Sequence, residues 1–395
     1  MKIEALRIKN FKAFKDVKLG NLPTLAVFIG ANGTGKTTLF DVFGFLRDSL
    51  QTNVKIALQK RGGFKEVMTR GESGAIEIEI KFREDYDEKT RSPLVTYSLI
   101  ISLENNQPVV EREILKYRRG RYGKPWHFLD FSHGSGMAIT NEDSYEDKEY
   151  KEEKQEQTID SPDILALKGL GQFQRFKAAN SFRKLIESWH VSDFHIGEAR
   201  PSQESGYSEH LSTRGENMAL VAQYLYENHR DLFETILKKM AQRVPGVSHV
   251  EAINTEDGRI ILKFQDGTFK DPFIARYVSD GTIKMFAYLL LLHDPTPHPL
   301  LCVEEPENQL YPNLFCGLVE EFRDYADNGG QVMISTHSPD VLNHVEMDEI
   351  FCLRKTQGVT HIERASNNQL LVDLAKEGDL AGALWKQGLF DGVNL

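Results

Sequence analysis

Cysteine is scarce in this chain, which has only three among 395 residues. Cys302, Cys316 and Cys352 show no C-x-x-C spacing and no nearby histidine cluster, so neither a zinc site nor a disulfide framework is indicated. Long apolar runs are also lacking, because the longest, from Met285 to Leu292, is far too short to span a bilayer. The first four residues are too polar for a signal peptide. We therefore expect a soluble, cytoplasmic protein with no membrane partner.

Positive charge is not in excess either, since the formal net charge is −10. This balance argues against a nonspecific grip on nucleic acid by the whole surface. Residues 116–127 are nevertheless basic with interleaved aromatic side chains. One interpretation is a nucleic-acid contact, with cations on phosphates and rings on bases; the other is a solvated hairpin tip. The chain lacks internal repeats and a sustained heptad pattern, which excludes a repeat architecture and a long coiled coil.

Residues 30–37 read G-A-N-G-T-G-K-T, the G-x-x-x-x-G-K-[ST] pattern of a phosphate-binding P-loop. An apolar run typical of a buried strand, Leu25 to Ile29, precedes it, and a segment able to form a helix follows. Glycines let the backbone bend around phosphate oxygens, and the loop amides and helix N-terminus then face the anion. Lys36 adds a positive charge at the β- and γ-phosphates, and the Thr37 hydroxyl is placed to ligate Mg²⁺. The predicted nucleotide-binding residues of this loop are Gly30, Asn32, Gly33, Thr34, Gly35, Lys36, Thr37 and Thr38.

A second apolar run, Leu300 to Val303, ends in two carboxylates, Glu304 and Glu305. This is the Walker B pattern, in which a buried strand delivers acids to the metal and to the attacking water. We expect Glu304 to bind Mg²⁺ and Glu305 to act as the general base. The next predicted strand leads to His337 at the carboxyl edge of the sheet, where ligands bind in open α/β folds and where His337 would hydrogen-bond the γ-phosphate.

A further phosphate site is predicted upstream, before a helical run from Met285 to Leu292. Ser279 can cap the N-terminus of that helix, and Gly281 permits close approach of the backbone. This site lies about 240 residues from Lys36, and the P-loop already holds one triphosphate. An economical arrangement places Ser279, Asp280 and Gly281 against the triphosphate bound by another copy of the chain.

In this order, the P-loop, S-D-G-T at 279–282, V-E-E-P-E-N-Q-L-Y-P at 303–312 and S-T-H-S-P at 335–339 resemble an ABC-type ATPase head. The chain resembles the SMC/RecF-like branch of AAA-family predicted ATPases, which includes the ATPase halves of overcoming-lysogenization-defect nucleases and of several anti-phage systems. The opening residues 6–14 also resemble that branch, and the resemblance covers about residues 1–70 and 270–355. It implies a homodimer with ATP sandwiched between two heads. Ser279 and Gly281 would contact the γ-phosphate across the dimer, Thr37 and Glu304 would bind Mg²⁺, Glu305 would activate water and His337 would be the switch histidine.

Two residues depart from the family pattern, since Asp280 stands where transporter-type sequences have Gly and Glu304 stands where Asp is usual. The Q-loop glutamine is not identified, and Gln59 is only a candidate. About 58 residues follow His337, too few for a fused TOPRIM nuclease domain, so a nuclease-like effector would be a separate chain. The predicted function is an ATP-hydrolysing switch that controls such an effector in bacterial anti-phage defence. The alternatives are a DNA-binding RecF-like repair ATPase and a scaffold that binds nucleotide without hydrolysing it.

The predicted fold is α/β: a P-loop NTPase core of the ABC/SMC-head type with an antiparallel β-meander and an inserted helical lobe. Alternating apolar and polar residues predict strands at 2–9, 75–82, 94–103 and 109–117. We expect the ATPase core at 1–70 and 270–395, a β-rich extension at 71–140, a flexible acidic loop at 141–163 and a mainly helical lobe at 164–269. The loop is expected because charged and amide residues dominate that range.

Overall fold

The computed structural model describes residues 2–83, 94–118, 125–142, 153–390 and 393. Contacts divide the chain into two compact units. Unit 1 consists of Met1–Trp189, Met347–Asp379 and Leu384–Leu395, and unit 2 of His190–Glu346 and Leu380–Ala383. This division cuts the chain elsewhere than the ranges expected from the sequence, which grouped residues 270–346 with the P-loop segment. Among the described residues, no helix is long and apolar enough to cross a membrane.

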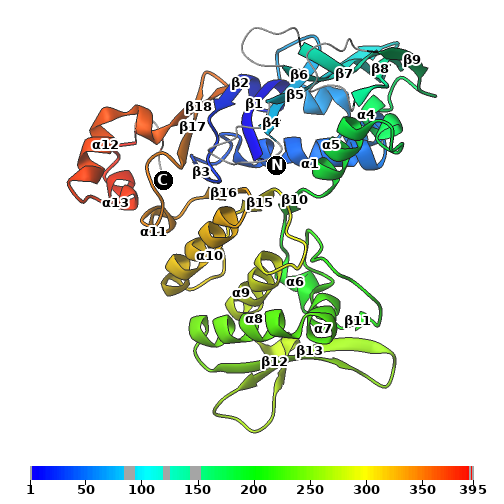
Figure 1. Cartoon of the computed structure of the whole chain (residues 1–395). Coiled ribbons are helices and arrows are strands. Elements are labelled where there is room, and N and C mark those ends of the chain that lie inside the picture. The colour runs from blue at the N-terminus through cyan, green and yellow to red at the C-terminus, as the bar shows by residue number, and fades with distance from the viewer. Residues whose placement is uncertain (1, 84–93, 119–124, 143–152, 391–392, 394–395) are drawn as a thin grey trace. The chain divides into compact units, whose positions relative to one another are not determined.

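An antiparallel sheet of eight strands dominates unit 1 (Figure 1). Its order is β2–β1–β4–β5–β6–β7–β8–β9. The strands are β1 (Lys2–Phe11), β2 (Phe14–Gly20), β4 (Ile76–Arg83), β5 (Val95–Glu104), β6 (Gln107–Arg118), β7 (Pro125–Ser132), β8 (Ser135–Ile139) and β9 (Lys154–Thr158). The four strands predicted from alternation and their antiparallel meander are confirmed.

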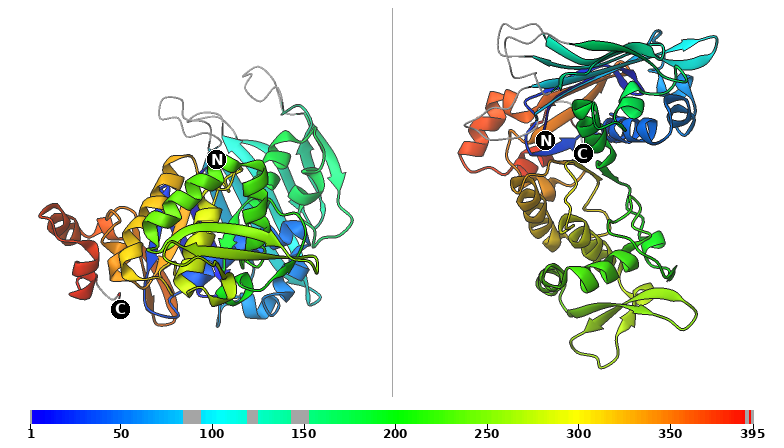
Figure 2. Two further views of the ribbon diagram at one scale, coloured as in Figure 1. Left: turned by 90° about the horizontal axis from the view of Figure 1, so that it is seen from below. Right: turned by 45° about the vertical axis from the view of Figure 1, so that its right-hand side comes forward.

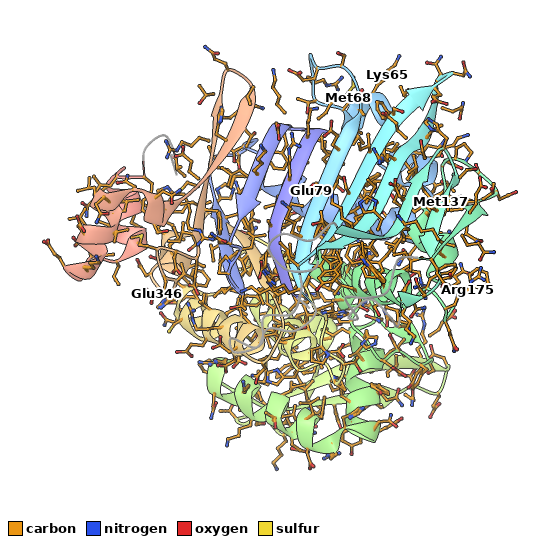
Figure 3. All side chains as sticks on the ribbon, turned by 45° about the horizontal axis from the view of Figure 1, so that its top comes forward. Lys65, Met68, Glu79, Met137, Arg175 and Glu346 are labelled. Carbon is orange, nitrogen blue, oxygen red and sulfur yellow. The ribbon has the colours of Figure 1, made fainter. Side chains whose placement is uncertain are left out.

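Buried and half-buried residues alternate along the strands of this sheet, so one of its faces is apolar. Helices cover this apolar face. In β4, Ile78 is buried and Glu79 lies on the opposite, polar face (Figure 3). On the apolar side, Phe182 of α5 (Lys177–Glu187) stacks on Phe82 with ring centroids 4.4 Å apart. Each such side chain contributes about 2 kcal/mol by burial, so the pattern in the sequence and the covering helices stabilise the sheet together.

Unit 1 also contains β3 (Leu25–Ile29), β17 (Ile350–Thr356) and β18 (Val359–Arg364). β3 pairs in parallel with β17, and β17 pairs antiparallel with β18. All five residues of β3 are buried, as the continuous apolar run predicts. The P-loop and then α1 (Lys36–Gln51) follow β3, so the predicted strand–loop–helix is confirmed. The remaining helices of this unit are α2 (Val54–Gln59), α3 (Phe64–Val67), α4 (Ala166–Leu170), η4 (Ala365–Asn367) and α12 (Gln369–Lys376), while α13 (Ala381–Lys386) contains residues of both units.

Unit 2 is built around three parallel strands in the order β10 (His190–Ser192), β15 (Leu301–Glu304) and β16 (Val332–Thr336). Their carboxyl ends lie side by side, and Glu304 is the register partner of Ser335. α9 (Asp280–Leu292) is apolar around its whole circumference and almost entirely buried, which makes it the central helix. The other helices are α6 (Ile196–Ala199), α7 (Met218–Asn228), α8 (Arg230–Arg243), η2 (Ala275–Tyr277), η3 (Pro312–Leu314), α10 (Phe315–Asp327) and α11 (Pro339–Leu342).

A small antiparallel sheet completes unit 2, with β13 (Arg259–Asp266) between β11 (Gln203–Glu204) and β12 (Val247–Asn254), and with β14 (Phe273–Ile274) paired to β13. α7 and α8 pack on this sheet, drawn in green to yellow in Figure 2. The range 164–269 therefore holds two paired strands of eight residues in addition to the expected helices.

The expectation of a flexible loop at 141–163 needs correction, because Lys154–Thr158 form β9 and pair with β8. Most side chains of β9 are exposed, and backbone pairing at a sheet edge requires no apolar side chain. Composition therefore could not predict this strand. Residues 143–152 of the same range lie outside the described residues. The basic stretch 116–127 falls on β6, β7 and their connection, of which residues 119–124 also lie outside the described residues.

Candidate nucleotide site

Glycines shape the loop between β3 and α1. Gly33 and Gly35 have φ angles of 76° and 108°, in the left-handed region that other residues rarely adopt. A Cβ on Gly30 would lie 2.6 Å from the carbonyl oxygen of Leu353 and 2.7 Å from Oγ1 of Thr34. The loop can therefore hold this path only with glycine at these positions.

No side chain caps the N-terminus of α1, because the N-cap residue is Gly35. First-turn N–H groups of a helix form an anion site together with the helix dipole. The loop before them is fixed from two sides: Thr34 Oγ1 donates to the carbonyl of Ala31 at 2.8 Å, and Thr360 Oγ1 on β18 donates to the carbonyl of Thr34 at 2.8 Å. Unit 1 thus holds the phosphate loop in place with its own hydrogen bonds.

Lys36 is buried, and its ammonium donates to the carbonyls of Gly30 at 2.7 Å and Ala31 at 3.3 Å. A phosphate would therefore compete with the loop's own carbonyls for this charge. Asn32 and Thr37 are exposed, and Thr38 is half-buried. The predicted loop residues consequently fall into a buried set that shapes the loop and an exposed set that faces outward.

In unit 2, the carboxyl end of β15 presents Glu304 and Glu305. The strand before them is fully buried, and the N–H of Glu305 donates to the carbonyl of Ser335 at 2.9 Å, so the chain stays beside β16 for one more residue. Glu305 has a φ of 43°, a left-handed value that costs a non-glycine residue about 1–2 kcal/mol. Strain of this kind concentrates at functional sites, and here it takes Glu305 out of the alternation of the strand.

Glu305 and His337 lie together. Oε1 of Glu305 is 3.4 Å from Nε2 of His337, and Oε2 accepts a hydrogen bond from Nδ2 of Asn308 at 2.6 Å. The two side chains are 36% and 30% exposed, so both border solvent. One carboxylate oxygen is held by an amide while the other faces an imidazole, an arrangement that can orient and deprotonate a water molecule.

Two supporting residues were missed by the sequence analysis. Glu307 is buried, and its Oε1 accepts from Oγ1 of Thr336 at 2.7 Å and from the N–H of His337 at 2.9 Å. Lys284 of α9 donates to the carbonyls of Asn308 at 2.7 Å and Glu305 at 3.3 Å. A lone lysine inside the apolar run of α9 and a third acid in the Walker B segment were the available signals.

Burial lowers the pKa of Lys284 to about 8, against the opposing effect of the Glu307 and Glu305 charges. Oε2 of Glu307 is buried and has no hydrogen-bond partner among the described residues. Together with the carboxylate of Glu304 in the same unit, this oxygen is a hard donor of the kind that Mg²⁺ prefers. The chemistry of the residues present therefore fits a magnesium ion.

The predicted cap at the start of α9 is confirmed. Ser279 Oγ accepts from the N–H of Thr282 at 3.3 Å and lies 2.7 Å from its hydroxyl oxygen. Asp280 forms an ion pair with Arg200, which also donates to the carbonyl of Arg276 at 2.9 Å. The sequence analysis did not identify Arg200.

Ser279 and Asp280 are exposed and Gly281 is half-buried. All three line a cavity of about 830 Å³ that Arg243 and Tyr311 also border. The start of α9 is therefore a surface feature of unit 2. Of the predicted residues, Glu304, Glu305 and His337 lie at the ends of two adjacent strands of unit 2, Ser279 to Gly281 begin α9 of the same unit, and the P-loop residues belong to unit 1.

A P-loop between a buried strand and a helix, with acids and a histidine ending two adjacent parallel strands, defines a P-loop NTPase. Residues 25–343 match the family described as "AAA domain, putative AbiEii toxin, Type IV TA system", and the chain belongs to this family. The predicted assignment to SMC/RecF-like AAA ATPases is confirmed.

Among curated proteins, the DNA replication and repair protein RecF of Lactococcus lactis subsp. lactis (strain IL1403) is 39% identical over 46 residues. That stretch is 12% of this chain and 13% of RecF, well under two thirds of the relative's length. Among solved structures, the SmcHead bound to the C-winged helix domain of ScpA has a TM-score of 0.54 at 14% identity, covering 92% of this chain and 98% of that chain. The SMC head domain from Thermotoga maritima has a TM-score of 0.45 at 11% identity, covering 92% and 99%. The likeness to the SmcHead gives the chain an SMC-head-like fold and confirms the predicted fold class.

Proposed function

We propose that this protein is an ATP-binding and ATP-hydrolysing switch. The observation that supports it best is the group formed by Glu305, His337 and Glu307 at the ends of β15 and β16, because it combines a base with two fixed neighbours. Family membership adds the expectation of nucleotide binding. The P-loop would hold the triphosphate, with Thr37 and Glu304 as the oxygen ligands of Mg²⁺.

In the proposed reaction, water attacks the γ-phosphorus, the bond between that phosphorus and the leaving oxygen of ADP breaks, and inorganic phosphate departs. Glu305 accepts the proton of the water at Oε1, while Asn308 holds Oε2 in place. His337 donates a hydrogen bond to the γ-phosphate and loses it when the phosphate leaves. Bound Mg²⁺ would neutralise charge that develops on the phosphate oxygens.

The proposed assembly is a homodimer in which Ser279, Asp280 and Gly281 of one copy contact the triphosphate of the other. Their position at an exposed helix N-terminus supports this, since a partner can reach them. A carboxylate at Asp280 would repel the phosphate, but the Arg200 ion pair offsets that charge. Asp280 is therefore compatible with the role that glycine fills in transporter-type sequences.

The oligomeric state in the presence of Mg²⁺ and ATP tests the proposal, together with release of phosphate. We expect Glu305→Gln to accumulate as a dimer with ATP and to be monomeric without it, because it binds ATP without turning it over. Lys36→Ala should stay monomeric throughout. A monomer for every variant with saturating ATP would contradict the sandwich, and nucleotide binding without phosphate release by the unmodified chain would leave only a scaffold.

The nucleotide-dependent dimer would control a separate effector chain, of the nuclease-like kind expected for anti-phage defence. Recovery of a co-purifying chain by Glu305→Gln with ATP, and not by Lys36→Ala, would support this role. A second candidate is a DNA-binding repair ATPase, which the 46-residue similarity to RecF favours. It predicts salt-dependent DNA binding that is lost when Arg118, Arg119 and Arg121 are changed to Glu; absence of binding at low salt would remove it.

A further inference from the structure

Three side chains with metal-binding atoms lie together in unit 2, at the opposite end of β15 from Glu304 and Glu305. His210 lies between β11 and α7, and Asp294 and His298 lie in the connection from α9 to β15. One ligand atom of each lies within 4.8 Å of the others. Ser279 caps the other end of α9, a helix of 13 residues and so about 20 Å long, and Glu304 ends β15 on the far side from His298.

The three ligand atoms lie near enough to one another to surround one metal ion. Nδ1 of His210 is 2.8 Å from Oδ2 of Asp294. Bonds of about 2.0–2.1 Å in a tetrahedral zinc site separate its ligand atoms by about 3.3–3.5 Å. The three ligand atoms lie within 4.8 Å of one another, so ligation requires changes of up to about 1.5 Å in their separations, within the reach of side-chain torsions. Two imidazole nitrogens and one carboxylate oxygen form a donor set that zinc and its neighbours in the transition series take readily.

The Asp294 carboxylate and the backbones of both histidines have hydrogen-bond partners outside the cluster. The second oxygen of Asp294, Oδ1, accepts from the N–H of Thr296 at 2.8 Å. The carbonyl of His210 accepts from Nδ2 of Asn217 at 2.8 Å, and the carbonyl of His298 accepts from the Tyr325 hydroxyl at 2.7 Å. The Thr296 contact orients the carboxylate, as outer contacts do at metal sites, and the two carbonyl contacts fix the backbone from which the imidazoles project.

The side chains of Asp294 and His210 differ in exposure in a way that suits a metal site. The side chain of Asp294 is 2% exposed, which keeps water from competing for its oxygens, while that of His210 is 44% exposed and offers an entry path. The imidazole of His190 lies beside that of His298, with ring centroids 4.9 Å apart.

We propose that His210, Asp294 and His298 bind a divalent transition-metal ion, with Zn²⁺ as the best fit, leaving one position to water or another ligand. The ion joins the segment before α7 to the connection between α9 and β15. Ser279 lies at the start of α9, and Glu304 at the end of β15. It stabilises unit 2 and is independent of the nucleotide.

The test uses the full chain, treated with chelator, returned to metal-free buffer and titrated with Co²⁺ in the absence of nucleotide and Mg²⁺. We expect one Co²⁺ per chain with the visible absorption of a tetrahedral site, displaced by Zn²⁺, and a rise in melting temperature with Zn²⁺. His210→Ala and His298→Ala should each weaken Co²⁺ affinity by at least about 10-fold.

Controls separate this site from general metal binding. His361→Ala, on β18 in unit 1, and Lys36→Ala should both leave Co²⁺ affinity unchanged. Because His210 is at the surface, its truncation should preserve the circular dichroism spectrum of the chain, so a loss of binding there reports on the ligand. Absence of saturable Co²⁺ or Zn²⁺ binding, or binding that survives both His210→Ala and His298→Ala, overturns the proposal.

Discussion

Replacing Glu305 by glutamine removes the proposed base and almost nothing else. A glutamine keeps the length of the side chain and an oxygen that can accept from Nδ2 of Asn308, the contact that now measures 2.6 Å. The carboxylate is 36% exposed, so its pairing with His337 at 3.4 Å contributes at most about 1 kcal/mol to folding. We therefore expect the melting temperature to change by only a few degrees.

The effect on catalysis should be much larger. General base catalysis contributes about 10²–10⁴-fold to a rate, which corresponds to about 3–5 kcal/mol in activation free energy. Steady-state phosphate release should fall by that factor for Glu305→Gln, while affinity for a fluorescent ATP analogue stays within about 3-fold, because no phosphate ligand is lost.

Glu320→Gln is the matched control, since it makes the same substitution at another exposed carboxylate. Glu320 lies on α10, its side chain is 59% exposed, and it pairs with Arg243 at 3.2 Å. Its phosphate release should equal that of the unmodified chain. A Glu305→Gln rate within about 3-fold of the unmodified rate would refute the assignment of the base. A large fall in melting temperature would instead show that the residue acts on the fold.

Three further predictions concern other groups. Burial raises the pKa of the Glu113 carboxyl from 4.5 to about 7. Between pH 4.5 and about pH 7 the folded chain therefore binds more protons than the unfolded chain. The free energy of unfolding should fall by about 3 kcal/mol as the pH rises through this range. Urea denaturation at several pH values should show this slope and its loss in Glu113→Gln; an unchanged slope in the variant contradicts it. Glu307→Ala should lower the free energy of unfolding by about 2–4 kcal/mol, because the buried Thr336 hydroxyl and the half-buried N–H of His337 lose their acceptor. Glu307→Gln keeps an acceptor and most of the stability, and equal melting temperatures of the two variants would count against this. Lys36→Ala should weaken ATP binding by at least about 10-fold in a fluorescence titration without unfolding unit 1, and retained affinity would exclude the P-loop as the binding site.

Features that depend on neighbouring residues were predictable from the sequence. The P-loop is one contiguous segment whose glycine spacing is fixed by the backbone path around a phosphate, and its flanking strand is a single apolar run. Four strands of the eight-stranded sheet, β1, β4, β5 and β6, were visible because a two-residue period follows directly from strand geometry. The cap of Ser279 on α9 depends on a contact three residues along the chain.

Only the tertiary structure could decide which distant residues meet. Glu307 reaches the N–H of His337 across 30 residues, Arg200 reaches Asp280 across 80, and His210 reaches Asp294 across 84. The edge strand β9 forms through backbone pairing, which leaves no trace in composition. Local patterns fix φ, ψ and burial of short segments, whereas contacts between segments depend on how strands order and helices pack, and for that reason the supporting residues of the site and the histidine cluster emerged only from the fold.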